Sequence, residues 1–135
     1  IIAIALLITL SDQIAVQIKL AVERLRPCKE PDIRLWVHLV DDRCGGMFGF
    51  VSNHAANSFA MAVFTSLLFK NRYYSWFIII WATVVSYSRI YLGVHYPGDV
   101  LCGAFLGIIL ACVIYKIYRY AEIRIYHDKE KRNKK

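Results

Sequence analysis

The chain has no cluster of aspartates that would hold a magnesium ion, and no set of Cys and His residues spaced for zinc. It also lacks the features of a secretion signal, because no basic stretch precedes its first apolar segment and no small-residue cleavage site follows it. The basic residues are not interleaved with an aromatic face that would bind nucleic acid. We therefore expect no metal ion, no cofactor and no nucleic-acid partner.

The residues that are present favour a membrane protein. By composition 58% of the chain is hydrophobic, yet it carries 17 Lys and Arg against 10 Asp and Glu. Such a mixture fits a protein whose apolar segments are long and whose charges gather in loops and tails. The sequence does not start with Met, and it is apolar from Ile1 to Leu10 apart from Thr9. We therefore expect an upstream part, with one or more helices, to be missing.

Four apolar segments predict the fold. They cover residues 1–20, 55–69, 73–90 and 100–118. The third and fourth reach the length of roughly 20 residues that a spanning helix needs, whereas the second is short. Backbone groups in lipid must be satisfied within their own segment, so helix is the expected conformation. The prediction is an all-α transmembrane helical bundle with about four helices in this chain.

The charges between these segments predict the topology. Lys and Arg are enriched in cytoplasmic loops, so the basic loop at 70–72 and the basic tail at 121–135 are assigned to the cytoplasm. Counting helices then places the long loop at 24–47 and the short turn at 91–99 together on the opposite face. Residues 1–120 are expected to form one membrane-embedded domain that precedes the tail.

Three polar clusters interrupt the apolar pattern on that opposite face. They are Lys19, Arg24, Arg26 and Pro27; Ser52, Asn53 and His54; and Ser88, Arg89, His95 and Asp99. Ionisable groups at membrane depth are energetically costly, and they usually mark a functional site. We expect the helix order to bring these three clusters to one surface.

The residue types in the clusters suit phosphoryl transfer. Three cations could surround a phosphate dianion: Lys19, Arg26 and Arg89. Two histidines allow one nucleophile and one general acid. Pro97 suits the first turn of a helix, so Asp99 would lie in that turn, where it can hold one ring nitrogen of His95. Together these residues indicate metal-free transfer through a covalent histidine.

The order and spacing of the clusters resemble the type 2 phosphatidic acid phosphatase superfamily. The matching motifs are Lys19 followed after six residues by Arg26-Pro27, then Ser52-Asn53-His54, and then Ser88-Arg89 with His95 and Asp99 at the family spacing. The resemblance covers about Lys19 to Leu110. It implies six helices in the whole protein, a site at the outer leaflet and a bacterial-type member of the family.

The resemblance also implies a role for each matching residue. His95 would attack phosphorus, Asp99 would orient His95, and His54 would protonate the leaving oxygen and later activate water. The phosphate-binding residues would be Lys19, Arg26, Arg89, Ser52 and Asn53. The expected partner is a lipid phosphate substrate in the bilayer, and the expected location is a bacterial inner membrane with the site facing the periplasm. No oligomeric state is indicated.

The second motif departs from the usual Pro-Ser-Gly-His. Val51 stands where the family has Pro, and Asn53 stands where it has Gly. Gly would let the backbone approach phosphate closely or adopt a positive φ, and Asn is the next best residue for a positive φ. We therefore expect the phosphate loop to keep its form.

Four further residues need interpretation. Arg24 is read as a loop charge rather than a phosphate ligand, and Asp12 as a polar contact between helices with Ser11 and Gln13 rather than an ion path. Cys28 and Cys44 flank the long loop and would suit a disulfide if that face is oxidising. Spacing alone does not decide between a bridge and two free thiols.

Three readings of the function remain open at this point. The favoured one is an integral-membrane phosphatase that hydrolyses a lipid-linked phosphate or diphosphate through phosphohistidine. Substrates in such bacterial branches include undecaprenyl diphosphate, phosphatidylglycerol phosphate, phosphatidate and lipid A phosphates. The alternatives are a lipid phosphotransferase with the same site and a non-catalytic transporter or lipid-binding relative. Intact His54, His95 and Asp99 argue against the last reading.

Overall fold

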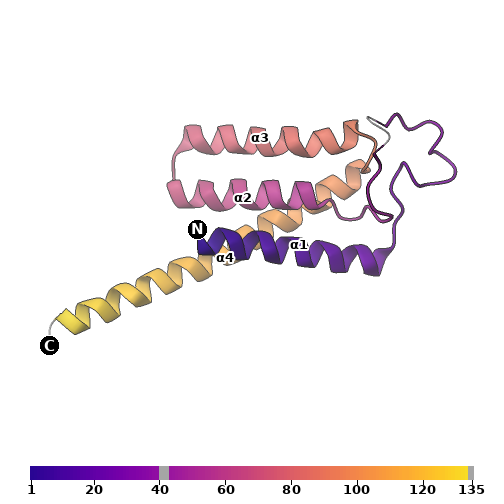
Figure 1. Ribbon diagram of the computed structural model, residues 1–135. Helices are drawn as coiled ribbons and strands as arrows, with labels where there is room; N and C mark the ends of the chain where they lie inside the picture. The colour runs from indigo at the N-terminus through magenta and orange to yellow at the C-terminus, as the bar shows by residue number, and fades with distance from the viewer. Residues whose placement is uncertain (40–42, 134–135) are drawn as a thin grey trace.

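The computed structural model describes residues 1–39 and 43–133, and this part of the chain is helical with no strands. The helices are α1 (Ile2–Val22), α2 (Asn53–Phe69), α3 (Arg72–Tyr91) and α4 (Pro97–Asn133). They run alternately up and down, so that consecutive helices are antiparallel (Figure 1). Residues 40–42 of the predicted long loop and residues 134–135 of the predicted tail lie outside the described residues.

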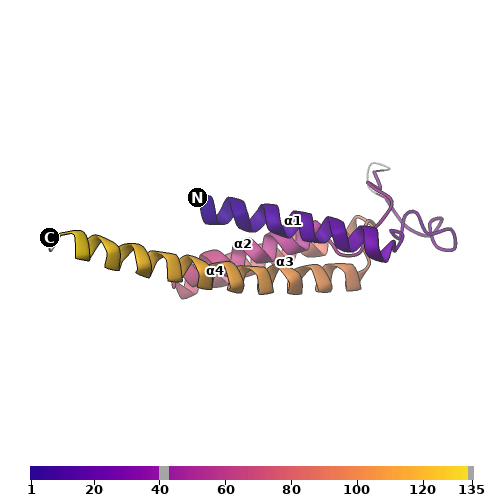
Figure 2. The ribbon, with the colours of Figure 1, turned by 90° about the horizontal axis from the view of Figure 1, so that it is seen from below.

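The all-α prediction is confirmed, and each predicted apolar segment corresponds to one helix. Pro97 begins α4 and Asp99 lies in its first turn, as expected from the sequence. The fourth segment differs in its end. Instead of stopping near 118, α4 continues as one helix of 37 residues, and its last turns extend beyond the other three helices (Figure 2).

Two of the described helices, α1 and α4, are long and apolar enough to cross a membrane, judged by length and composition. We expected 73–90 to qualify as well. The corresponding helix, α3, is long enough at 20 residues, but its tyrosines, serines and terminal arginines lower its mean hydropathy, and it does not pass this test. The second predicted segment forms α2, which is short, as expected, at 17 residues.

The outer faces of the helices are apolar and exposed. On α3, Trp76 is 66% exposed, Phe77 68% and Val84 61%, while on α4 Leu101 is 70% exposed and Phe105 65%. Apolar surface of this extent is unfavourable in water. It matches a bundle whose outer surface contacts lipid and whose backbone groups are satisfied within the helices.

The closest helix packing is between α2 and α4, and it depends on small residues. The buried stripe on α4 repeats every four residues and consists of Gly103, Gly107 and Ala111. A Cβ added at Gly103 would lie 2.5 Å from the Ser52 carbonyl oxygen, and one at Gly107 would overlap the Ala56 carbonyl oxygen. Small residues at this spacing let two helix backbones approach closely in a membrane.

The helix order places the functional segments at one end of the bundle. The loop from α1 to α2 and the turn from α3 to α4 lie together there, while the loop from α2 to α3 lies at the other end (Figures 1 and 2). The segments that carry the three polar clusters therefore meet, as the helix order predicted.

We predict that Gly107→Ala destabilises the bundle. The new methyl group would overlap the carbonyl of Ala56, which is backbone and cannot rotate away, so α4 would have to move off α2. Overpacking of this kind costs about 1–3 kcal/mol. The measurement is Tm in detergent, with Gly46→Ala as control because a Cβ there would meet nothing within 4 Å. An unchanged Tm for Gly107→Ala would contradict the close packing of the two helices.

Candidate active site

Asp99 is the buried centre of the site. Its side chain is 0% exposed, and its two oxygens contact three separate groups. Oδ2 accepts a hydrogen bond from the backbone N–H of Tyr96 at 3.0 Å and lies 3.5 Å from Nδ1 of His95. Oδ1 lies 3.0 Å from Nη1 of Arg24. A buried carboxylate is tolerated only when it is paired and hydrogen-bonded, so these partners account for its position.

His95 lies on the turn before α4 with 4% of its surface exposed. Its Nδ1 faces Asp99, and its Nε2 lies 3.2 Å from Nη1 of Arg26. A guanidinium can only donate, so Nε2 must present its lone pair and the ring proton must be on Nδ1. Burial lowers the pKa of His95; the hydrogen bond to Asp99 opposes this, and the charge of Arg26 adds to it. The imidazole is therefore neutral at pH 7, with an unprotonated Nε2.

A basic cavity of about 370 Å³ opens beside His95. Its charged and titratable lining consists of Arg26, Arg43, Arg89, His54 and His95. No carboxylate lines it within the described part of the chain. Guanidinium groups match the geometry of phosphate oxygens, so the cavity is suited to an anion such as a phosphate group.

The elements around the cavity explain how these side chains meet. Arg26 lies in the segment after α1, where its N–H donates to the Met47 carbonyl and its Nη1 donates to the Val94 carbonyl at 3.1 Å. His54 lies in the first turn of α2, and Arg89 lies in the last turn of α3. The cavity is thus assembled from three helix ends and the long loop.

Three of the predicted phosphate-binding residues do not line this cavity. Lys19 donates to the Asn53 side-chain oxygen, and Asn53 donates to Oδ1 of Asp12 at 2.9 Å. Ser52 is 0% exposed, beneath Gly103 of α4. Asn53 is helical and does not use the positive φ that we considered for it. Its side chain joins α1 to α2 instead.

Asp12 makes the interhelical polar contact that we expected. Its Oδ1 accepts hydrogen bonds from the side chains of Asn53 at 2.9 Å and Asn57 at 2.8 Å. Both partners lie on α2, rather than beside Asp12 on its own helix. A polar link of this kind between membrane helices contributes modestly to packing and fixes their register.

Arg24 has a larger part in the site than its reading as a loop charge implied. Besides its contact with Asp99, its guanidinium lies 4.2 Å from the centre of the Tyr96 ring. Arg24 therefore reaches across to the turn before α4. No sequence pattern indicated this contact, because Arg24 and Asp99 are 75 residues apart along the chain.

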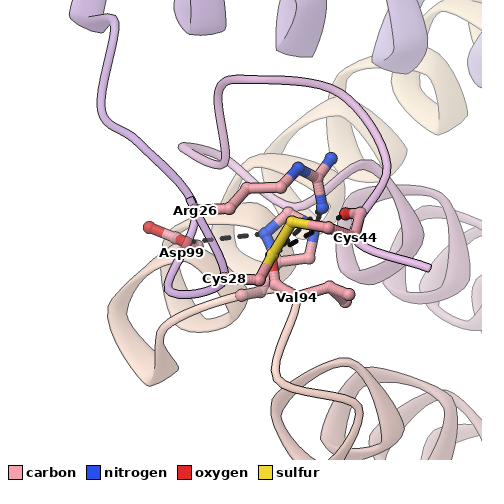
Figure 3. Close-up of a disulfide and its surroundings, with 6 residues drawn as sticks. Arg26, Cys28, Cys44, Val94 and Asp99 are labelled. Atoms are coloured by element: carbon pink, nitrogen blue, oxygen red, sulfur yellow. Dashed lines mark hydrogen bonds and ion pairs between the residues drawn. A yellow bond between two sulfur atoms is a disulfide. The ribbon is translucent and has the colours of Figure 1, made fainter. Parts of the chain in front are cut away.

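The long loop is closed by a disulfide between Cys28 and Cys44, whose Cα atoms are 6.0 Å apart. Figure 3 shows this bond beside Arg26, Val94 and Asp99. After the disulfide, Gly45 has a φ of +80°, and a Cβ there would lie 3.7 Å from Cζ of Arg26. The loop therefore passes alongside the Arg26 guanidinium. It also carries Arg43, a cavity residue that sequence reasoning missed and that only its position beside Cys44 could have indicated.

Comparison with known proteins identifies the family. A family model described as the PAP2 superfamily matches residues 1–123. A lipid A 4'-phosphatase of Bacteroides thetaiotaomicron is 45% identical over 130 residues, covering 95% of this chain and 58% of that protein. A lipid A 4'-phosphatase of Porphyromonas gingivalis is 42% identical over 101 residues, covering 75% of this chain and 43% of that protein.

A more distant relative is the undecaprenyl-diphosphatase BcrC of Bacillus subtilis, 33% identical over 67 residues, which are 50% of this chain and 34% of that protein. The chain spans about half the length of the two lipid A 4'-phosphatases. No solved structure matches it. The family match nevertheless covers nearly all of the chain, together with a helical bundle whose outer faces suit lipid. The chain belongs to the PAP2 superfamily and is an integral membrane protein.

Proposed function

We propose that the protein containing this chain is a membrane phosphatase that hydrolyses a lipid-linked phosphate through a phosphohistidine intermediate. The observation that carries the proposal is the basic cavity with His95 at its wall, buried and backed by Asp99. An unprotonated Nε2 is the form of imidazole that can attack phosphorus. The names of the relatives, lipid A 4'-phosphatase and undecaprenyl-diphosphatase, support the same class of reaction.

In the first step, the lone pair on Nε2 of His95 forms a bond to phosphorus, and the bond from phosphorus to the lipid oxygen breaks. His54 gives its proton to that leaving oxygen; burial and the charge of Arg89 lower the pKa of His54, so only its protonated fraction can act as the acid. The ring of His95 becomes positively charged, and the Asp99 carboxylate beside Nδ1 stabilises it. Arg26 and Arg89 hold the transferring phosphoryl oxygens, where negative charge must be stabilised.

In the second step, the now neutral His54 takes a proton from a water molecule as that water attacks phosphorus. The bond between phosphorus and Nε2 breaks, and inorganic phosphate leaves. His95 is again neutral with its proton on Nδ1, and His54 is again protonated. The cycle consumes one water molecule and needs no metal ion for its proton transfers.

The first substrate to test is the 4'-phosphate of lipid A. Two relatives that align with 95% and 75% of this chain carry the name lipid A 4'-phosphatase.

For topology, we propose that the cavity faces the periplasm of a bacterial inner membrane. The basic end of α4 would then be cytoplasmic, because its Lys and Arg residues favour that side. In this arrangement residues 1–120 form the membrane domain and 121–135 the tail.

We predict that His95→Ala removes phosphate release from the full-length protein in detergent, even with EDTA present. The variant lacks the nucleophile, so activity should fall by at least about 10³-fold. Lipid A, undecaprenyl diphosphate, phosphatidylglycerol phosphate and phosphatidate would be compared as substrates. Inorganic phosphate is the product to measure.

The control for this variant is His127→Ala, because His127 is an exposed histidine on the far end of α4. It should keep wild-type activity. Phosphate release by His95→Ala at the wild-type rate would refute the nucleophile assignment. Appearance of the phosphate on an acceptor lipid, without free phosphate, would favour the phosphotransferase reading instead.

The pH dependence should follow His95. Its pKa is lowered from 6.5, mainly by burial, so the neutral and nucleophilic form persists below that pH. We expect the acidic limb of kcat/KM below pH 6.5, at the same place for a monoester and a diphosphate substrate. Asp99→Asn removes an interaction that raises this pKa, so it should move the limb lower still.

Asp99→Asn should also lower the plateau of kcat, by about 10²–10⁴-fold, because the charged ring of the intermediate loses its partner. If the acidic limb of kcat/KM fell at pH 6.5 or above, or if it moved when the substrate was changed, that limb would not report His95. Tm of the variant shows whether the loss reflects catalysis or unfolding.

A further inference from the structure

We propose that Arg43 binds the phosphate group of the substrate, and that the Cys28–Cys44 disulfide holds Arg43 at the cavity. This inference rests on the proposed function, and it adds a residue that lies outside the three matching motifs. Its starting point is the cavity lining, where Arg43 stands with Arg26 and Arg89.

The three arginines differ in how many contacts their side chains make with other groups of the protein. Arg26 donates to the Val94 carbonyl and contacts Nε2 of His95. Arg89 contacts the hydroxyl of Ser88 through Nε. Among the described residues, no carboxylate pairs with Arg43, which is exposed at the cavity. Its guanidinium is therefore available to a bound anion, with a fork of donors that matches phosphate oxygens.

The position of Arg43 depends on the loop that carries it. Arg43 directly precedes Cys44, and Cys44 is bonded to Cys28, two residues after Arg26. The disulfide therefore ties the backbone next to Arg43 to the backbone next to Arg26. Residues 27–39 and 43–47 form turns and irregular structure rather than helix. A loop of this kind explores many conformations unless a cross-link restricts it.

The disulfide thus joins the backbone next to one cavity arginine, Arg43, to the segment that carries the other, Arg26. Gly45 supports this arrangement, since its backbone passes beside the Arg26 guanidinium, in a conformation that favours glycine. With the bond intact, Arg43 and Arg26 can hold one phosphate group together. With the bond reduced, Arg26 keeps its contacts to the turn before α4, while Arg43 loses its tether.

The main test is Arg43→Ala in the full-length protein, with a lipid phosphate as substrate. Arg43 is exposed, and among the described contacts Nε2 of His95 meets Arg26 rather than Arg43, so Arg43 should act chiefly on binding. We expect KM to rise about tenfold, while kcat changes little. Arg43→Lys should restore part of the loss. Arg34→Ala is the matched control, because Arg34 is an exposed arginine of the same loop that does not line the cavity.

The disulfide is tested by a double-mutant cycle. The pair Cys28→Ser and Cys44→Ser should raise KM as much as Arg43→Ala does, and adding Arg43→Ala to that pair should have little further effect. If the serine pair does not fold, reduction of the wild-type protein with dithiothreitol takes its place. If the increases in KM from the serine pair and from Arg43→Ala were fully additive, the disulfide would not position Arg43.

A second readout separates this inference from the proposed function. Inorganic phosphate is the probe, and its effect on Tm is measured in wild type, Arg43→Ala and Arg34→Ala. We expect phosphate to raise Tm of wild type and Arg34→Ala, and to raise it less for Arg43→Ala. If wild type gains stability from phosphate but hydrolyses no lipid, the proposed function fails and the Arg43 site stands. If lipid is hydrolysed but Arg43→Ala matches wild type in KM and in this shift, the Arg43 site is wrong.

Discussion

The buried carboxylate of Asp99 is the constraint on which the rest of the structure depends. A charge with no solvent contact is tolerated only when several partners compensate it, and these partners come from different segments. Arg24 arrives from the segment after α1, while His95 and the Tyr96 N–H arrive from the turn before α4. The Asp99 backbone oxygen also accepts the N–H of Ser52 at 3.0 Å, which fixes the start of α2. Satisfying this one group therefore brings the beginnings and ends of three helices to the same place.

The helix packing makes that convergence possible. Gly103 and Gly107 let the backbone of α4 lie directly against α2, and Gly103 lies one turn after Asp99. A larger residue would push the helices apart and separate Ser52 from Asp99. On the other side of α2, the contact between Asp12 and Asn53 fixes α1, from which Arg24 and Arg26 follow. The small-residue stripe and the polar contact therefore position the site from within the helical bundle.

The sequence was sufficient for the features that depend on local pattern. Apolar runs located the helices, Pro97 located the start of α4, and the four-residue step from His95 to Asp99 predicted their contact. The sequence could not predict which of several possible partners a long polar side chain contacts. Lys19 contacts Asn53 instead of lining the cavity, and no spacing rule distinguishes these outcomes for a long flexible side chain. Arg24 was read as a loop charge because its partner Asp99 is far away along the chain, and Arg43 was missed because it lies outside the three polar clusters. The Gly103 and Gly107 stripe was not predicted, although small residues every four positions are a known packing signal.

The contact between Arg26 and His95 connects the electrostatics of the site to the proposed reaction. In the unliganded site, the guanidinium donates to the nitrogen whose lone pair must attack phosphorus, and its charge helps to keep that nitrogen unprotonated. A phosphate group entering the cavity offers stronger acceptors to the same donors. In the proposed reaction, Arg26 would turn to the phosphate oxygens and so free the lone pair of Nε2 as phosphorus arrives beside it. In this reaction, the cation that helps to keep the nucleophile deprotonated would thus also position the phosphate group. Val94 holds Arg26 through its carbonyl, and Asp99 holds His95 from behind.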